Sequence, residues 1–154
     1  KISKINNKIV VLIGDGELNE GSVWEALQIA CAKNLDNLYI IVDRNWIQAN
    51  VFTEDLIPLE PLEDKFISFG AKTIRFDGNS FDDLHESFLL ASRERKKPSV
   101  LIANTIRGKG LPSIEGDPSR WFVHFSKEDV KKLIIELHGG FHDGNFDSDI
   151  TMVR

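Results

Sequence analysis

The chain has 154 residues, of which 42% are apolar, and a formal net charge of −5, which suits one globular core and disfavours a broad nucleic-acid surface. No apolar run reaches the roughly 20 residues that cross a bilayer, and a single cysteine, Cys31, excludes an internal disulfide. We therefore expect a cytoplasmic protein that binds neither nucleic acid nor membrane. Its globular domain is predicted over residues 1–138, followed by a polar tail over residues 139–154.

Strand and helix signals alternate along the chain. The first signal is the β-branched run Ile9–Ile13, typical of a central parallel strand that is buried on both faces. Further strands are predicted at residues 38–42, 72–76 and 99–105. Helices are predicted from a cap at Asn19 or Ser22 to a stop at Asn34, over residues 62–69, after an N-cap at Ser80, and over residues 126–138. This order implies right-handed crossovers, hence an α/β fold with a doubly wound, mostly parallel sheet flanked by helices.

The first predicted helix has apolar residues at roughly helical spacing, at Val23, Leu27, Ala30 and Ala32. Two later helices also have apolar residues at helical spacing, which indicates a buried face. The face of the helix after Ser80 is formed by Phe81, Leu84, Phe88, Leu89 and Ala91. The face of the last helix is formed by Val130, Leu133, Ile134 and Leu137. We expect both faces to pack against the rest of the domain.

Polar motifs follow the first two predicted strands: Gly14-Asp15-Gly16-Glu17 and Asp43-Arg44-Asn45. In such sheets ligands bind beyond the carboxyl ends of the strands. The Asp15 carboxylate and the Asn45 amide oxygen suit Mg²⁺, which shares its oxygen coordination with phosphate groups. Glycines let main-chain N–H groups approach a phosphate. The two motifs predict a magnesium diphosphate site, although Gly-Asp-Gly alone is also an ordinary strand-to-helix turn.

The motifs continue into a longer pattern: Gly14–Gly21, Trp24-Glu25-Ala26, Leu35–Leu38 and Asp43–Asn45. From about Ile9 to Ser126 this pattern resembles the diphosphate-binding domain of transketolases and related thiamine-diphosphate enzymes, including split transketolase-like proteins. The resemblance implies the thiamine-diphosphate-binding fold, with thiamine diphosphate and Mg²⁺ or another divalent cation as cofactors. It implies metal binding by Asp15, Asn45 and the main-chain carbonyl of Ile47, and cofactor contacts by Gly14, Asp15, Gly16, Glu17, Asn45, Ile47 and Lys109.

Two glutamates match family carboxylates that link the two cofactor sites of the assembled enzyme. By this resemblance Glu20 and Glu25 belong to a hydrogen-bonded network across the subunit interface, and Glu20 also has a catalytic role. Their residue types and positions alone would indicate solvated acids on a helix face. Lys109 lies in a glycine-rich segment, Asn104–Gly110, that resembles the loop closing over the cofactor, where it would meet a phosphate. An ordinary solvated loop lysine is the alternative.

The family also has an active-site histidine shortly after this loop, in the split forms often directly after a tryptophan. In this chain Trp121 is followed by Phe122, so the match is shifted. His124 is the candidate for the catalytic histidine that contacts diphosphate or substrate. A surface or core histidine without that role is the alternative.

The resemblance implies a thiamine-diphosphate- and Mg-binding subunit of a transketolase-like transferase. Its reaction would move a two-carbon ketol unit from a ketose donor to an aldose or aldehyde acceptor, with a sugar or sugar phosphate as substrate. A partner chain in a homo- or hetero-oligomer would supply the pyrimidine-binding domain and its activating glutamate. The chain looks like part of a subunit, because family members carry a further segment upstream of the first motif.

Three other functions compete with this one. The first component of a 2-oxo acid dehydrogenase is disfavoured because that family usually has two adjacent asparagines where this chain has Asp43-Arg44-Asn45. A non-catalytic interaction module of the same fold stays open. A nicotinamide-dinucleotide domain is excluded, since no Gly-x-Gly-x-x-Gly follows the first strand.

Overall fold

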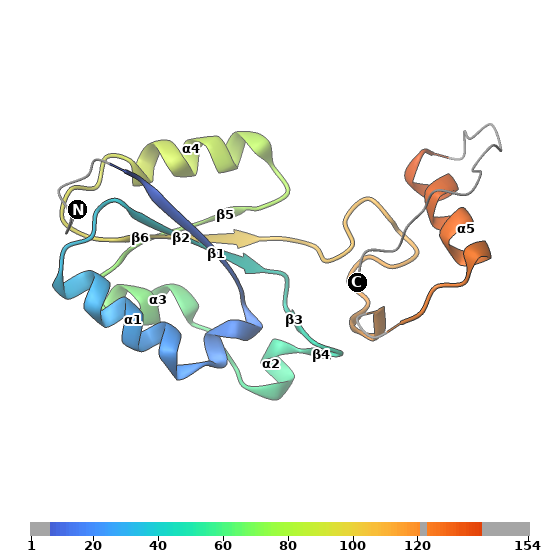
Figure 1. Cartoon of the computed structure of the whole chain (residues 1–154), viewed down its shortest axis with the longest axis horizontal. Helices are drawn as coiled ribbons and strands as arrows, with labels where there is room; N and C mark the ends of the chain where they lie inside the picture. Colours follow the sequence, from blue (N-terminus) through green and yellow to red (C-terminus); the bar gives the residue numbers. More distant parts are fainter. Residues whose placement is uncertain (1–6, 121–122, 140–154) are drawn as a thin grey trace.

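The computed structural model describes residues 7–120 and 123–139, and its centre is a parallel sheet. Four strands pair in the order β1-β2-β6-β5, and every pairing in this sheet is parallel. The strands are β1 (Ile9–Gly14), β2 (Leu38–Arg44), β5 (Lys72–Asp77) and β6 (Ser99–Asn104). The four predicted strands are therefore confirmed, and their carboxyl ends lie along one edge of the sheet (Figure 1).

Helices cover both faces of this sheet. Figure 1 shows α1 (Gly21–Ala32) and α3 (Leu62–Ser68) on one face and α4 (Phe81–Ala91) on the other. The first two crossovers advance from β1 to β2 and on to β5, whereas the third returns from β5 to β6. A crossover of the same hand that runs in the opposite direction places its helix on the opposite face. The predicted doubly wound α/β fold is thus confirmed.

The core consists of one apolar layer on each face of the sheet. Trp24 of α1 stacks on Phe66 of α3 with ring centroids 5.0 Å apart, which joins the two helices of the first layer. In the second layer, Phe88 of α4 packs on Tyr39 of β2. Val100, Leu101 and Ile102 of β6 point alternately into the two layers, and each is 0% exposed. The most buried strand of the sheet is therefore β6, in which only Asn104 is partly exposed.

The prediction that the first strand is central is wrong for the described part of the chain. β1 is the edge strand of the sheet, paired with β2 alone. Its apolar side chains are accordingly exposed, Val10 at 53% and Leu12 at 70%. A continuous apolar run indicates that a strand has two apolar faces, but it does not report whether the strand has one neighbour or two.

Helix boundaries follow the predictions at two places and depart from them at one. Asn34 adopts φ +51° just after α1 and ends it as expected, and the Ser80 hydroxyl accepts the N–H of Asp83 at 3.2 Å as the N-cap of α4. The predicted cap of α1 is wrong. Glu20 is the N-cap residue, without a side-chain bond. Asn19 donates to Gln48 Oε1 at 2.8 Å, and Ser22 already lies inside the helix.

The two predicted buried helix faces are less buried than their spacing suggests. In α4, Phe81 is 90% exposed, while Leu84 and Phe88 do pack on the sheet. The last helix, α5 (Lys127–Leu137), has no buried residue and lies beyond the carboxyl edge of the sheet (Figure 1). It contacts the loop after β6, where the Ser113 N–H donates to Glu136 at 2.7 Å. Helical spacing identified the helix correctly but not the surface that it meets.

Short elements occupy the segment after β2. A hairpin of β3 (Ile47–Gln48) and β4 (Val51–Phe52) leads into one turn of helix, α2 (Thr53–Leu56). A second short element, the 3₁₀ turn η1 (Gly16–Asn19), follows β1. Strands of two residues are too short to show periodicity, so the sequence did not reveal them. No helix among residues 7–120 and 123–139 combines the length and hydropathy needed to cross a membrane.

A buried arginine ties this segment to the sheet. Arg44 ends β2 and is 0% exposed. Its Nη1 donates to Asp15 Oδ2 at 2.8 Å and to Thr53 Oγ1 at 2.6 Å, and its Nη2 donates to Glu54 Oε1 at 2.5 Å. The guanidinium carbon also lies 3.7 Å from the centre of the Trp46 ring. Since a buried charge is tolerated only when it is paired, these contacts hold the segment after β2 in place.

The ion pairs continue from Arg44 to the far edge of the sheet. Glu60 lies 3.3 Å from Arg44 Nη2 and 2.9 Å from Nη2 of Arg75, which belongs to β5. Arg75 pairs in turn with Glu63 at the start of α3. Alternating positive and negative groups thus connect β2, the segment 53–60 and β5.

We expect the Glu60 pairing to stabilise the fold in a pH-dependent way. Burial acts to raise the pKa of Glu60, but the N–H of Leu62 and the Arg75 guanidinium together hold the pKa below its ordinary value. The stabilisation is therefore present above the unfolded-state pKa of about 4.3 and is lost as the pH falls through the lower folded-state pKa. Glu60→Gln should lower the free energy of unfolding by about 1 kcal/mol at neutral pH, a value reduced for solvent screening.

Urea unfolding at about pH 7 and about pH 3 measures this difference. The matched control is Glu63→Gln, which removes the other acid that pairs with Arg75. The Glu63 side chain is 45% exposed, against 33% for Glu60, so this substitution should lower the free energy of unfolding by less. An equal loss of stability at both pH values would contradict the assignment.

Candidate functional site

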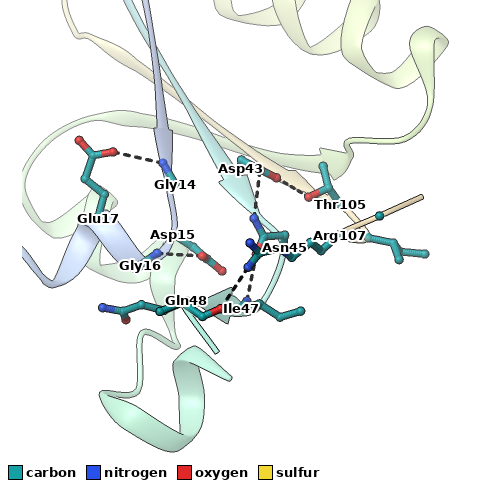
Figure 2. Close-up of a pocket in the computed structure, with 13 residues that line it drawn as sticks. Gly14, Asp15, Gly16, Glu17, Asp43, Asn45, Ile47, Gln48, Thr105 and Arg107 are labelled. Atoms are coloured by element: carbon teal, nitrogen blue, oxygen red, sulfur yellow. Dashed lines mark hydrogen bonds between the residues drawn. The ribbon is translucent and has the colours of Figure 1, made fainter. Parts of the chain in front are cut away.

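A cavity of about 780 Å³ lies at the carboxyl ends of β1, β2 and β6. Figure 2 shows residues from all three strand ends and from β3 pointing toward it. The lining comprises Gly14, Asp15, Gly16, Glu17, Asp43, Asn45, Ile47, Gln48, Ala49, Thr105, Ile106, Arg107 and Gly108. Six residues predicted to contact the cofactor, from Gly14 to Ile47, are therefore gathered at one place.

Asp15 is 1% exposed, and its carboxylate is held from three directions. Oδ2 accepts Nη1 of Arg44 and the N–H of Trp46, both at 2.8 Å, and Oδ1 accepts the N–H of Gly16, also at 2.8 Å. Burial raises the pKa of this carboxyl above its ordinary value, although Arg44 and the two N–H groups act to lower it. A cation bound at Oδ1 would offset part of the cost of keeping the carboxylate ionised.

Asn45 is fixed just as firmly on the other side of the cavity. Its amide oxygen accepts the N–H of Ile47 at 3.0 Å, and its amide nitrogen donates to Asp43 Oδ2 at 3.0 Å. The other oxygen of Asp43 accepts the hydroxyl of Thr105, so the residue after β6 also contributes to the orientation. These bonds, drawn in Figure 2, set which atom of the amide can meet a ligand.

The donor set of the cavity fits a hard cation. Among residues 7–120 and 123–139, no group of three or more His, Cys, Asp or Glu side chains could hold a metal ion. The ligands that the family resemblance implies are instead one carboxylate oxygen of Asp15, the amide oxygen of Asn45 and the main-chain carbonyl of Ile47. Oxygen ligands of this kind suit Mg²⁺, which completes its shell with phosphate oxygens and water. The residues present fit the predicted magnesium diphosphate site.

Seven cavity residues do not figure among the site residues predicted from the sequence: Asp43, Gln48, Ala49, Thr105, Ile106, Arg107 and Gly108. Asp43 and Thr105 orient Asn45, as described above. Arg107 donates to the carbonyl of Ala49 at 3.4 Å and brings a positive charge to the cavity. Thr105 and Arg107 belong to the segment Asn104–Gly110, for which the family resemblance implies closure over the cofactor, although only Lys109 of this segment was predicted as a contact.

The other predicted site residues lie outside the cavity. Glu20 and Glu25 are exposed near the start of α1, and Lys109 is half-exposed with its Nζ 4.0 Å from Glu115. His124 lines a second cavity of about 550 Å³, between the loop after β6 and α5. The described part of the chain does not bring these four side chains to Asp15 and Asn45. Their roles stay predictions, and Trp121 and Phe122 lie outside the described residues.

The amino-acid sequence of the chain is similar to those of known proteins. The family model described as "Transketolase, thiamine diphosphate binding domain" matches residues 1–148. A 6-deoxy-6-sulfo-D-fructose transketolase subunit from Clostridium sp. is 36% identical over 89% of this chain and 50% of its own length. An apulose-4-phosphate transketolase subunit from Actinobacillus succinogenes is 41% identical over 88% of this chain and 49% of its own length. The chain thus spans about half the length of these two relatives.

Solved structures share the fold. The transketolase from Leishmania mexicana matches with a TM-score of 0.77 at 24% identity, over 87% of this chain and 20% of that chain. The transketolase from Campylobacter jejuni matches with a TM-score of 0.69 at 24% identity, over 88% of this chain and 25% of that chain. These likenesses agree with the parallel sheet and its two helical layers. Together with the family match over residues 1–148, they lead to the conclusion that the chain belongs to the transketolase family.

Proposed function

We propose that this chain is the thiamine-diphosphate- and Mg²⁺-binding part of a transketolase-like transferase, which moves a two-carbon ketol unit from a ketose to an aldose or aldehyde. The observation that carries the proposal is the cavity that places oxygens of Asp15 and Asn45 beside the glycine turn after β1. Thiamine diphosphate, when bound, supplies the carbon nucleophile that carries the ketol unit. The chain's own residues bind and orient that cofactor.

The cation has an anchoring role in this proposal. Asp15, Asn45 and the carbonyl of Ile47 hold Mg²⁺, which neutralises the diphosphate, and Arg107 adds a further positive charge at the cavity. No metal-bound nucleophile is required for ketol transfer. The site therefore serves positioning and electrostatics, and the proton transfers on the cofactor are left to groups beyond this cavity.

The turn after β1 packs closely on Gln48 of β3 only because Gly16 has no side chain. A Cβ at this position would lie 2.7 Å from Cγ of Gln48, which is itself held by the 2.8 Å bond from Asn19. The backbone of η1 thus packs directly on β3. By contrast, a Cβ at Gly14 would meet nothing within 4 Å.

A partner chain completes the proposed enzyme. Two of the relatives are named as subunits of transketolases, and this chain spans about half the length of each. We propose that the partner brings the pyrimidine-binding domain with its activating glutamate, and that the exposed Glu20 and Glu25 join a network at that interface. Lys109 and His124 follow the cavity residue Gly108 in the chain, and their proposed contacts with phosphate or substrate require this segment to close over the cavity.

The substrate in this proposal is a sugar or sugar phosphate. The names of the two relatives refer to a sulfonated and a phosphorylated sugar. Both kinds of sugar carry an anionic group, for which Arg107 or Lys109 offers a cation on the segment after β6. The donor itself is a matter for direct measurement.

Removal of the proposed metal ligand should abolish cofactor binding. We expect Asp15→Ala, tested in the full chain with its partner, to weaken Mg²⁺-dependent binding of thiamine diphosphate at least about 100-fold by calorimetry. Asp15→Asn, which keeps the shape of the side chain, should behave similarly and guards against loss of the fold. The control is Asp55→Ala, because Asp55 is an exposed acid of the nearby helix α2. Undiminished binding in both Asp15 variants would overturn the proposed function.

Catalysis is tested separately from binding. The assembled enzyme, loaded with thiamine diphosphate and Mg²⁺, should release a shortened aldose from a phosphorylated or free ketose donor and extend an aldehyde acceptor by two carbons. Product analysis by mass spectrometry detects both. Cofactor binding without ketol transfer from any such donor would favour a non-catalytic interaction module or a different acyl donor.

The Gly16 contact provides a structural test of the same cavity. Gly16→Ala should displace Gln48, lower the free energy of unfolding by about 1–3 kcal/mol and weaken cofactor binding. Gln48→Ala in the same chain should restore part of the stability, because it removes Cγ and leaves only the contact at 2.9 Å to Cβ. Gly14→Ala is the matched control for stability. Equal destabilisation by the two glycine variants would contradict this packing.

A further inference from the structure

The turn between β5 and α4 holds the start of the segment that follows β6. Its residues Asp77, Gly78 and Asn79 lie beside the carboxyl end of β6, because β5 and β6 pair in parallel as far as Asp77 and Asn104. Two hydrogen bonds cross from the turn to the segment. The N–H of Gly78 donates to the carbonyl of Asn104 at 2.8 Å, and Oδ1 of Asn79 accepts the N–H of Ile106 at 3.0 Å. Neither Gly78 nor Asn79 lines the cavity.

The turn itself is a firm support for these bonds. Asp77 Oδ1 accepts the N–H of Asn79 at 2.9 Å, and the carbonyl of Asp77 accepts the N–H of Ser80 at 3.1 Å. The Ser80 hydroxyl in turn caps α4 through the N–H of Asp83. Bonds from an aspartate side chain to the main chain two residues on are a common way to fix a tight turn. Asn79 therefore uses its main chain within the turn and its side chain on the segment after β6.

Gly78 brings the turn close to this segment. A Cβ at Gly78 would lie 2.5 Å from Cγ2 of Thr105 and 2.8 Å from Cβ of Ala103, so a side chain there would push the two apart. On its other side, Thr105 donates its N–H to the carbonyl of Arg44 at 3.1 Å. The segment thus leaves β6 clamped between the end of β2 and the turn after β5.

The clamped residues lead directly into the wall of the cavity. Thr105 and Ile106 line the cavity, and so does the next residue, Arg107 (Figure 2). Beyond Ile106 the chain folds back on itself, since the N–H of Gly116 donates to the carbonyl of Arg107 at 2.9 Å. Residues 107–116 therefore form a compact loop, and the bond from Ile106 to the turn fixes the point at which that loop leaves the sheet.

We propose that Asn79 is a positioning residue, which fixes Ile106 and thereby holds Arg107 at the cavity for binding of the anionic diphosphate. This inference rests on the proposed function, because it assumes that the cavity binds thiamine diphosphate. Without the Asn79 oxygen, the start of the loop would sample further positions. The affinity for the diphosphate would then fall with the fraction of molecules in which Arg107 stays at the cavity.

Two measurements on the full chain with its partner test this role. In the unliganded protein, the N–H of Ile106 should exchange with solvent about three- to tenfold faster in Asn79→Ala than in the unaltered protein. Calorimetry in the presence of Mg²⁺ should show that the same variant binds thiamine diphosphate about three- to tenfold more weakly, the range that one exposed hydrogen bond controls. Asn79→Asp keeps an oxygen acceptor, so both values should return to within about twofold of those of the unaltered protein.

The matched control is Ser80→Ala, which separates positioning from a structural role. This substitution removes the N-cap of α4 one residue away and should lower the midpoint of thermal unfolding at least as much as Asn79→Ala does. The hydrogen bonds of Ser80 within the described residues stay inside residues 77–84. Ser80→Ala should therefore leave both the exchange of the Ile106 N–H and the affinity for thiamine diphosphate unchanged.

The outcomes distinguish this inference from the function on which it rests. If Ser80→Ala weakens cofactor binding as much as Asn79→Ala, or if Asn79→Asp binds as weakly as Asn79→Ala, the positioning role is overturned and the proposed function stands. Unchanged cofactor affinity in Asn79→Ala would also overturn the positioning role. If the unaltered protein with its partner does not bind thiamine diphosphate in the presence of Mg²⁺, the proposed function fails, and the inference fails with it.

Discussion

The buried ion pair between Arg44 and Asp15 is the interaction on which the rest of this structure depends. It joins the ends of β1 and β2 at 2.8 Å, beneath the floor of the cavity. Through Thr53 and Glu54 the same guanidinium also holds the segment that carries β3, β4 and α2. Buried pairs of this kind add little net stability over apolar packing, but removing one partner is costly. Their value here is the fixed geometry of a carboxylate.

The parallel sheet supplies the other half of that geometry. Gly14 of β1 lies opposite Asp43 of β2, and Arg44 of β2 lies opposite Asn104 of β6. The ends of these three strands therefore meet at one edge of the sheet. The bond from Thr105 to Asp43 and the bond from Asn45 to Asp43 turn this alignment into a defined amide orientation. The cavity thus follows from strand order and register, and loop sequence only decides which groups line it.

Much of the fold and the centre of the site could be predicted from the sequence. The apolar runs predicted the four strands. The rule that ligands bind at the carboxyl ends of parallel strands correctly predicted that Asp15 and Asn45, 30 positions apart in the chain, line the same cavity. The rest depends on packing that no local pattern reports. The edge position of β1, the exposure of Phe81 and the burial of Arg44 are all set by tertiary neighbours. An arginine between two polar residues would ordinarily be placed at the surface.

The exposed side of β1 has a consequence for handling this chain. Within the described residues, one side of the strand's backbone ladder has no strand partner, and Ile9, Val10, Val11 and Leu12 are each at least 39% exposed. An apolar edge without charges or prolines is a template for pairing with any extended segment. The edge of β1 is therefore a place at which copies of the isolated polypeptide can associate, and a preparation in which that edge is covered should resist aggregation better than one in which it is bare.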